Sequence, residues 1–248
     1  MTKIASKKRP VVYSDFEAAR ERLARAIPAG PFYGTLVGPS GSGKTSLLRE
    51  VAATLDRHRF QSHYLAHSGT STSGLGRFLA EILHITPRRS HTETLHAMSQ
   101  ALRALPFRII LFVDEAHLLS DDALQEVRLL AESELESPPL FTVLLAGAPE
   151  LKKRLDAPFL FPLKRRISVR LELTGLQQDE VGPFLSFRLG DEAASRFAAD
   201  VLPVIFERTR GIPALVEDLA RLCLESVPEK AVVTLGAVQE VIESWEVA

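Results

Sequence analysis

Hydrophobic residues along the first two thirds of this chain form short runs separated by stretches with helical spacing. Runs without polar positions are typical of strands that are buried on both faces of a sheet. The predicted strands are 33–37, 61–66, 108–113, 140–146 and 167–173. The predicted helices of this region are 14–27, 46–52, 75–83, 92–105, 121–136 and 151–155. Strands that alternate with helices predict an α/β fold with a parallel sheet and helices on both faces.

The pattern changes near residue 172. The last predicted strand, 167–173, alternates apolar and polar residues, so one of its faces should be exposed to water. Thr174 and Gln177 then form a predicted capping box. The helices predicted after it are 178–189, 192–208, 213–226 and 235–245. We therefore expect a flexible basic arm at 1–12, an α/β core at 13–171 and a small all-helical domain at 172–248.

Composition and charge narrow the class of protein. The 248 residues carry a net charge of −1, so any contact with nucleic acid must come from local basic patches. Cys223 is the single cysteine, which excludes an internal disulfide and a cysteine zinc site. We find no apolar run as long as a membrane span, and residues 1–9 lack the apolar stretch of a signal peptide. We therefore expect a globular cytoplasmic protein without a membrane segment.

A glycine-rich loop lies between the first predicted strand and the second predicted helix. Its residues, continued by the start of the helix, are Gly38, Pro39, Ser40, Gly41, Ser42, Gly43, Lys44, Thr45 and Ser46. Glycines let the backbone approach a polyphosphate, and the N–H groups of the loop and the next helical turn then point at the anion. In this pattern Lys44 reaches the β- and γ-phosphates, and the Thr45 hydroxyl is a ligand of Mg²⁺. The alternative is a loop that matches the pattern by chance.

Two carboxylates follow the buried strand 108–113. Downstream of a phosphate loop, Asp114 in this position can hold Mg²⁺, and Glu115 can orient the water that attacks the γ-phosphate. The alternative is that both acids only favour the start of the next helical segment. The letters Asp-Glu-Ala-His at 114–117 also match a helicase box, but 248 residues leave no room for the second motor domain of such an enzyme.

Positive charge gathers between residues 152 and 170. The cations there are Lys152, Lys153, Arg154, Lys164, Arg165, Arg166 and Arg170, and the single acid is Asp156. Such an asymmetry indicates either a solvated basic face or a surface that meets an anion.

Five segments together resemble the motifs of the AAA+ ATPases. They are 38–45, 114–117, 144–151, 165–170 and 211–213. Within these ATPases the chain is most similar to the ExeA-like group, which includes the TnsC, TniB and IstB-type ATPases of bacterial transposons. The resemblance implies a P-loop NTPase core with a helical lid, Mg²⁺-dependent ATP hydrolysis at a subunit interface, and a ring or helical filament as the homo-oligomer.

The resemblance also implies roles for single residues. Arg166 occupies the place of an arginine finger, which reaches the γ-phosphate of a neighbouring subunit, and Arg165 is the reserve candidate. The alternative for both is a solvated basic face. Two positions depart from the family pattern, because the strand-end sensor position is Ala148 and the second-sensor arginine is replaced by Ala214. We therefore expect slow hydrolysis, with ATP binding acting mainly as an assembly switch.

By the same resemblance, the expected function is regulation of DNA transposition. ATP-bound subunits would assemble on double-stranded DNA without sequence preference and recruit or activate a transposase, with a target-selection protein as a second candidate partner. In the resembling proteins DNA is held by the loop after the second strand and by the next helical turn. The corresponding candidates here are Ser71, Thr72, Arg88 and Arg89. The alternative is that these residues lie in ordinary exposed turns.

Two other functions stay open. One is an ExeA-like assembly ATPase of a secretion system, which we would expect to continue into a membrane span and a cell-wall-binding region. The other is a nucleotide-switched signalling ATPase without DNA binding, which requires an effector on a separate chain. ATP-dependent assembly on duplex DNA would separate the transposition function from both.

Overall fold

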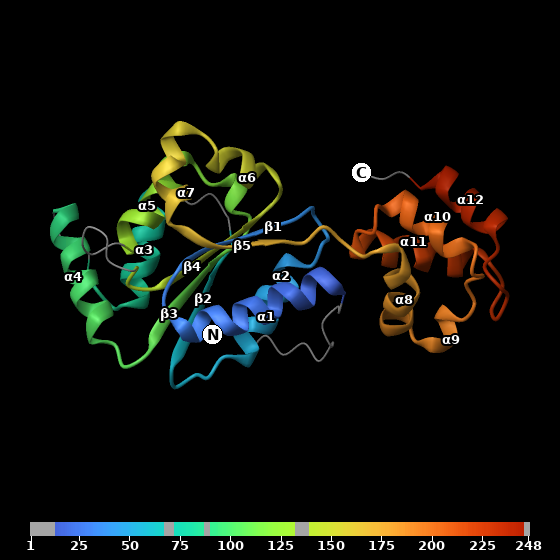
Figure 1. Cartoon of the computed structure of the whole chain (residues 1–248), viewed down its shortest axis with the longest axis horizontal. Coiled ribbons are helices and arrows are strands. Elements are labelled where there is room, and N and C mark those ends of the chain that lie inside the picture. Colours follow the sequence, from blue (N-terminus) through green and yellow to red (C-terminus); the bar gives the residue numbers. More distant parts are fainter. Residues whose placement is uncertain (1–12, 67–71, 87–89, 132–138, 246–248) are drawn as a thin grey trace. The chain divides into compact units, whose positions relative to one another are not determined.

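The computed structural model describes residues 13–66, 72–86, 90–131 and 139–245, and Figure 1 shows their arrangement. The strands are β1 Tyr33–Val37, β2 Phe60–Leu65, β3 Arg108–Val113, β4 Thr142–Gly147 and β5 Ile167–Glu172. The α-helices up to β5 are α1 Ser14–Ala29, α2 Lys44–Thr54, α3 Thr72–Ile82, α4 His91–Ala104, α5 Asp121–Ala131, α6 Glu150–Leu155 and α7 Phe161–Arg166. After β5 come α8 Val181–Leu189, α9 Asp191–Ala194, α10 Val201–Thr209, α11 Pro213–Ser226 and α12 Leu235–Ser244. Short 3₁₀ turns are η1 Ala116–Leu118, η2 Pro158–Leu160 and η3 Gln178–Glu180.

The chain divides into two compact units. The sheet unit holds Arg20–Gly38 and Leu48–Glu172, and the helical unit holds Met1–Ala19, Pro39–Leu47 and Leu173–Ala248. The phosphate loop therefore groups with the C-terminal helices, although it follows β1 in the chain. The division into 13–171 and 172–248 stays a prediction.

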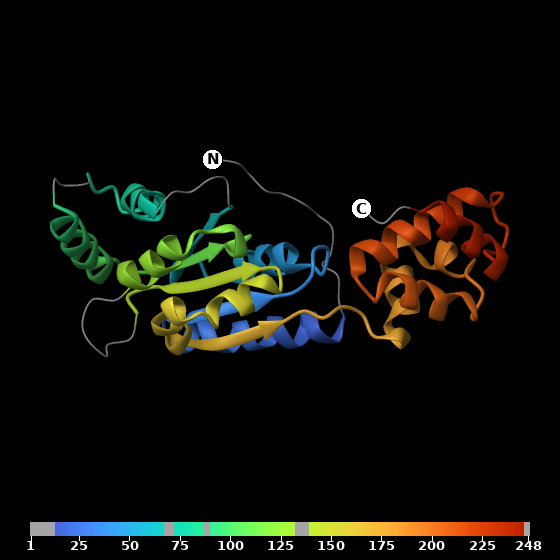
Figure 2. The same cartoon turned by 90° about the horizontal axis from the view of Figure 1, so that it is seen from above.

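The sheet unit is built on five parallel strands in the order β2-β3-β4-β1-β5. The strand arrows point the same way in Figure 2. The carboxyl ends of all strands therefore lie at one edge of the sheet, where ligands bind in open α/β folds. This architecture confirms the predicted fold class, a parallel sheet with helices.

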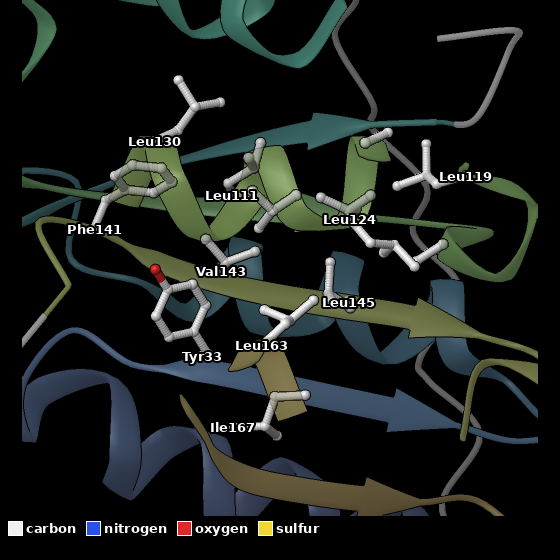
Figure 3. Packing of buried hydrophobic residues seen from close by; sticks show 14 of the residues in the cluster. Tyr33, Leu111, Leu119, Leu124, Leu130, Phe141, Val143, Leu145, Leu163 and Ile167 are labelled. Atoms are coloured by element: carbon white, nitrogen blue, oxygen red, sulfur yellow. The ribbon is translucent and has the colours of Figure 1, made fainter. Parts of the chain in front are cut away.

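A continuous hydrophobic cluster covers one face of this sheet (Figure 3). Leu111, Val143 and Leu145 point into it from the strands, and Leu124 of α5 and Leu163 of α7 pack on them. Because side chains alternate along a strand, the neighbouring residues face the other way, and they are buried as well: Leu36, Ile110, Phe112 and Leu144. Burial on both faces explains why these strands read as unbroken apolar runs. Truncating a core leucine such as Leu124 to Ala should cost about 2–5 kcal/mol of stability.

Several helix ends differ from the sequence prediction, and proline explains two of them. α1 continues through Pro28 to Ala29, where the Pro28 carbonyl accepts a hydrogen bond of 3.0 Å from Arg108. This bond satisfies one of the carbonyl groups that a helix end leaves without a partner. No helix was predicted between residues 155 and 167, but η2 and α7 form there with proline in their first turn, where no N–H is needed.

Two predictions in the helical unit are also wrong. The single helix expected at 192–208 is broken between α9 and α10, where Phe197 forms a bridge with Val233. The capping box lies three residues later than predicted, with Gln177 as the cap and Glu180 as its partner. Thr174 instead donates to Asp15 through its hydroxyl at 2.5 Å. Sequence spacing alone could not anticipate a contact with a residue so far along the chain.

Candidate nucleotide site

The phosphate loop has the backbone shape that an anion cradle requires. Gly41 has a φ of 80° and Gly43 a φ of 96°, which residues with a Cβ rarely adopt. The Ser42 N–H donates to the Pro39 carbonyl at 3.2 Å, so the loop closes on itself before α2 begins at Lys44. The first turn of an eleven-residue helix then offers its N–H groups to an anion.

Residues that precede the sheet in sequence support this loop. The Tyr13 hydroxyl, which is buried, donates to the Ser42 carbonyl at 2.6 Å. Phe16 is fully buried, and its ring would lie 3.7 Å from a Cβ at Gly43, which is ordinary van der Waals distance. Burial raises the pKa of the Tyr13 hydroxyl, so it stays protonated and remains a donor.

The second-sensor position contacts the loop directly but carries only a methyl group. The Ala214 N–H donates to the Gly41 carbonyl at 3.3 Å. A Cβ added at Gly41 would lie 2.8 Å from the Ala214 Cβ, closer than real Cβ atoms approach. Gly41 is therefore required by conformation and by space. Residue 214 is alanine and not arginine, so a small apolar side chain lies beside the loop.

The surroundings of the Lys44 and Ser42 side chains show whether the loop suits a phosphate group. The Lys44 side chain is buried, and its ammonium donates to the Pro39 carbonyl at 2.9 Å, within the loop. The Ser42 Oγ is buried without a hydrogen-bond partner among the described residues. A cation and a polar atom held at a ring of backbone N–H groups suit a polyphosphate. The residues present therefore fit the phosphates of a nucleotide.

At the other candidate position, Asp114 directly follows β3 and is 3% exposed. Its Oδ2 accepts a hydrogen bond of 2.5 Å from the Tyr64 hydroxyl, and its Oδ1 accepts one of 2.9 Å from the Glu115 N–H. Both donors hold the carboxylate in one orientation at the carboxyl end of β3, where a Mg²⁺ ligand is expected. No local pattern indicates a role for Tyr64, because its partner is fifty residues away.

Glu115 stands in a strained position beside His117. Its φ of 52° is left-handed, which costs a residue with a side chain about 1–2 kcal/mol. Its Oε2 lies 3.5 Å from the His117 Nδ1. The same nitrogen accepts a hydrogen bond of 3.3 Å from the Ala148 N–H, so the neutral ring carries its proton on Nε2. Only a protonated ring could donate to Glu115 through Nδ1.

His117 thus joins the ends of two strands. A Cβ at Gly147, the last residue of β4, would lie 3.1 Å from the His117 backbone nitrogen. The absence of a side chain at Gly147 therefore lets the His117 backbone approach β4 closely. The His117 carbonyl accepts a hydrogen bond of 2.6 Å from Arg154. In the usual arrangement a polar side chain at position 148 would sense the nucleotide; here the main chain of Ala148 contacts an imidazole next to Glu115.

Part of the positive charge of the basic segment 152–170 is paired with carboxylates of the same chain. Lys152 pairs with Glu172 at 3.1 Å, Arg154 pairs with Asp121, and Lys164 pairs with Asp156. Arg165 is exposed near the end of α7, and the half-buried Arg166 is its last residue. Three of the seven cations of this segment are therefore balanced by nearby carboxylates.

The DNA-binding candidates receive no structural description. Ser71, Arg88 and Arg89 lie outside the described residues. Thr72 begins α3, but the surroundings of its side chain are likewise outside the described part. Among the described residues, no group of three or more His, Cys, Asp and Glu side chains is placed to hold a metal ion. A Mg²⁺ ion bound to nucleotide phosphates needs only one or two protein ligands.

No helix in the described ranges is long and apolar enough to cross a membrane. Comparison with curated proteins finds general secretion pathway protein A of Aeromonas hydrophila, which is 28% identical over 204 residues. The match covers 80% of this chain but only 37% of that protein. The activity and partners of the longer protein therefore do not pass to this chain by similarity alone.

Solved structures with low sequence identity share the fold. The Aeropyrum pernix Orc1 protein in complex with DNA has a TM-score of 0.64 at 19% identity, over 95% of this chain and 66% of that one. Cdc6p of Pyrobaculum aerophilum has a TM-score of 0.64 at 18% identity, over 96% and 70%. The R170A variant of Thermotoga maritima RuvB has a TM-score of 0.58 at 21% identity, over 92% and 68%.

The family profile of the AAA domain matches residues 31–155, half of the chain. This range contains the phosphate loop, Asp114, Glu115 and the first four strands. The geometry of the loop and the acids after β3 agree with it. The chain therefore belongs to the AAA domain family, whose members are P-loop ATPases.

Proposed function

We propose that this chain is an ATP-dependent regulator of DNA transposition, which assembles on duplex DNA in its ATP-bound state and recruits or activates a transposase. The observation that carries the ATP-dependent part is the closed, glycine-shaped loop with the buried Lys44 ammonium at its centre. The DNA-related part rests on the resemblance of the sequence motifs to transposon ATPases.

In this proposal each residue of the site has a stated task. The loop N–H groups and Lys44 bind the phosphates, and Thr45 and Asp114 are the ligands of Mg²⁺. The bound ion would neutralise charge on the β- and γ-phosphates. Glu115 orients the attacking water and accepts its proton, and its left-handed backbone holds the carboxylate away from a regular helix. His117 accepts a hydrogen bond from the Ala148 N–H and so holds the end of β4 beside Glu115.

The proposed working form is a homo-oligomer, in a ring or a helical filament. Ala148 and Ala214 supply no cation, so the charge that develops on the transferred phosphoryl group calls for an arginine from a neighbour. Arg166 and Arg165, at the end of α7, are the candidates for this arginine finger. Hydrolysis is slow until assembly supplies that residue.

A second candidate function is favoured by one comparison. The relative from Aeromonas hydrophila is named for a secretion pathway, and it matches 80% of this chain. In that case the ATP-bound assembly would act on protein partners and would not bind DNA. The solved structure of Orc1 in complex with DNA shares the fold and is compatible with a DNA-bound assembly, but fold alone does not choose between the two.

The deciding experiment is sedimentation of the purified chain with a long, sequence-neutral duplex. The mixtures contain ATP, ADP or no nucleotide, across a salt series. We expect co-sedimentation that requires ATP and weakens steeply with salt, because phosphate contacts release counterions. The Lys44→Ala variant is the matched control and should not assemble. Assembly with ATP that ignores DNA at low salt would contradict the transposition function and support the secretion-type alternative.

A further inference from the structure

A pocket of about 400 Å³ lies at the amino-terminal edge of the sheet. Arg59, immediately before β2, and Arg108, the first residue of β3, line it. Leu140, two residues before β4, and Arg103 of α4 complete the rim. Asp114 follows the opposite end of the six-residue β3, so the length of the strand, about 20 Å, separates pocket and acid. The pocket is thus distinct from the candidate catalytic carboxylates.

Two of the arginines are held by one aromatic ring. The guanidinium carbon of Arg108 lies 4.8 Å from the centroid of the Phe60 ring, and that of Arg59 lies 5.4 Å from it. The Arg108 N–H also donates to the Arg59 carbonyl at 2.9 Å, which fixes the two backbones side by side. Stacking on a ring restricts a guanidinium to few orientations while leaving its N–H groups available.

Two of the pocket's arginines, Arg59 and Arg108, differ from Lys152, Arg154 and Lys164, which are paired with carboxylates. Within the described ranges, neither Arg59 nor Arg108 forms an ion pair with a carboxylate. Two like charges on neighbouring strands repel each other, so an arrangement of this kind costs stability unless an anion joins it.

The three arginines of the pocket differ in the interactions that they make within the protein. Arg103 lies in the last turn of α4, where the helix dipole favours a cation. Arg108 caps the Pro28 carbonyl. Arg59 is exposed, its guanidinium lies over the Phe60 ring, and its side chain forms no hydrogen bond or ion pair within the described residues. It is the residue whose presence the fold explains least.

We propose that this pocket binds phosphate groups, and that the phosphodiester backbone of duplex DNA is their source. Planar guanidinium groups match phosphate oxygens in pairs, and three of them around one cavity provide more donors than a single phosphate can accept. The choice of DNA over a small polyphosphate rests on the proposed function. The prediction that the pocket binds phosphate groups rests on its arginines and is independent of that function.

The test uses the full chain, with ATP present in the DNA titrations and with Lys44→Ala added only in the tripolyphosphate titrations, so that the phosphate loop does not bind that ligand. Arg59→Glu is the principal variant, because its side chain has no hydrogen bond to lose among the described residues. Arg22→Glu on α1 makes the same charge change at an exposed arginine outside the pocket. Each protein is titrated with a sequence-neutral duplex by fluorescence anisotropy over a salt series, and with tripolyphosphate by calorimetry.

We expect Arg59→Glu to weaken DNA binding about tenfold at low salt and to reduce the salt slope by about 1. Arg22→Glu should change affinity by less than about twofold. Arg108→Gln is a second variant, with a thermal melt to show that it is folded. Equal losses for Arg59→Glu and Arg22→Glu would overturn the proposal while leaving DNA binding intact. Tripolyphosphate binding that Arg59→Glu abolishes, without DNA binding by the parent, would support the pocket and reject DNA as partner. Binding of neither ligand would reject the pocket.

Discussion

Two buried carboxylates of the sheet unit, Asp114 and Glu126, meet opposite surroundings. At the end of β3, both oxygens of Asp114 accept hydrogen bonds, from the Tyr64 hydroxyl and the Glu115 N–H. Between α3 and α5, the Glu126 carboxylate is 7% exposed and accepts a hydrogen bond from the Gly76 N–H. Its Oε2 has no hydrogen-bond partner in the part of the chain that the structure describes. Burial raises the pKa of Glu126 to about 7.

The two carboxylates are buried to a similar extent but differ in the number of hydrogen-bond donors that meet their oxygens. At Asp114 a donor meets each oxygen, so the carboxylate is fully hydrogen-bonded and held in one orientation. A carboxylate with an oxygen left unpaired in the core is favoured in its neutral form. Depth of burial alone therefore does not identify a functional acid; the hydrogen bonds that meet it do.

The strongest test of this contrast removes the charge at each acid without changing its shape. We expect Asp114→Asn to lower the turnover number for ATP by at least about 100-fold, because a charged ligand of the metal is lost. The matched change Glu126→Gln should leave turnover within about twofold. Steady-state phosphate release, measured with a Mg²⁺ titration, checks both. Similar losses in the two variants would break the comparison.

The next effect concerns His117, which connects Glu115 with the end of β4. We expect His117→Ala to lower the turnover number roughly tenfold with little change in ATP affinity, because the Ala148 N–H loses its acceptor and the end of β4 beside Glu115 is held less firmly. His117→Asn can still accept from the Ala148 N–H and should recover part of the loss. Single-turnover rates and nucleotide titration separate the two quantities. A loss of ATP affinity equal to the loss of rate would indicate a purely structural role.

Removing the hydroxyl at Tyr64 should have a smaller effect. Tyr64→Phe leaves Asp114 with one fewer donor, so we expect a loss of turnover of about threefold to tenfold and a higher Mg²⁺ requirement. The control is Tyr33→Phe, since the Tyr33 hydroxyl donates to the Arg128 carbonyl at 3.0 Å, away from both acids. An unchanged Mg²⁺ requirement in Tyr64→Phe would mean that Asp114 does not need this donor.

The smallest effect is a pH-dependent change in stability at Glu126. The folded pKa of about 7 lies above the ordinary glutamate value of 4.5, so the folded state binds more protons than the unfolded state between these pH values. Stability therefore falls as pH rises through this window, and the cost is complete above pH 7. Glu126→Gln should be more stable than the parent by about 1–2 kcal/mol at pH 8 and nearly equal to it at pH 5. Urea unfolding at both pH values checks this, with Glu81→Gln on the exposed side of α3 as the control.

Sequence reasoning located the strands and the phosphate loop because both depend on local patterns. β1 and β3 begin and end where the apolar runs do, since burial on both faces excludes polar positions. Proline was misleading at α7, where it starts a helix that had been predicted as a loop. The break between α9 and α10 depends on the distant Val233, which no local pattern reports.

The residues of the candidate site could be predicted from the sequence only where they depend on local patterns. Asp114 and Glu115 follow from their place after a strand. The Tyr64 hydroxyl and the contact between Ala148 and His117 do not, because they join residues 50 and 31 positions apart. Ala148 and Ala214 were seen as missing sensors, and the structure adds what stands in their place: an imidazole at one and a close backbone contact at the other.

The support of the phosphate loop by Tyr13 and Phe16 has a practical side. The family match begins at residue 31, so a shortened protein designed on that boundary would keep every residue of the nucleotide motif and lose both of these neighbours. Asp15, which accepts from Thr174, would be lost with them. The smallest active fragment should therefore start before Tyr13, and the beginning of α1 belongs to the enzyme's working parts as much as the loop that it holds in shape.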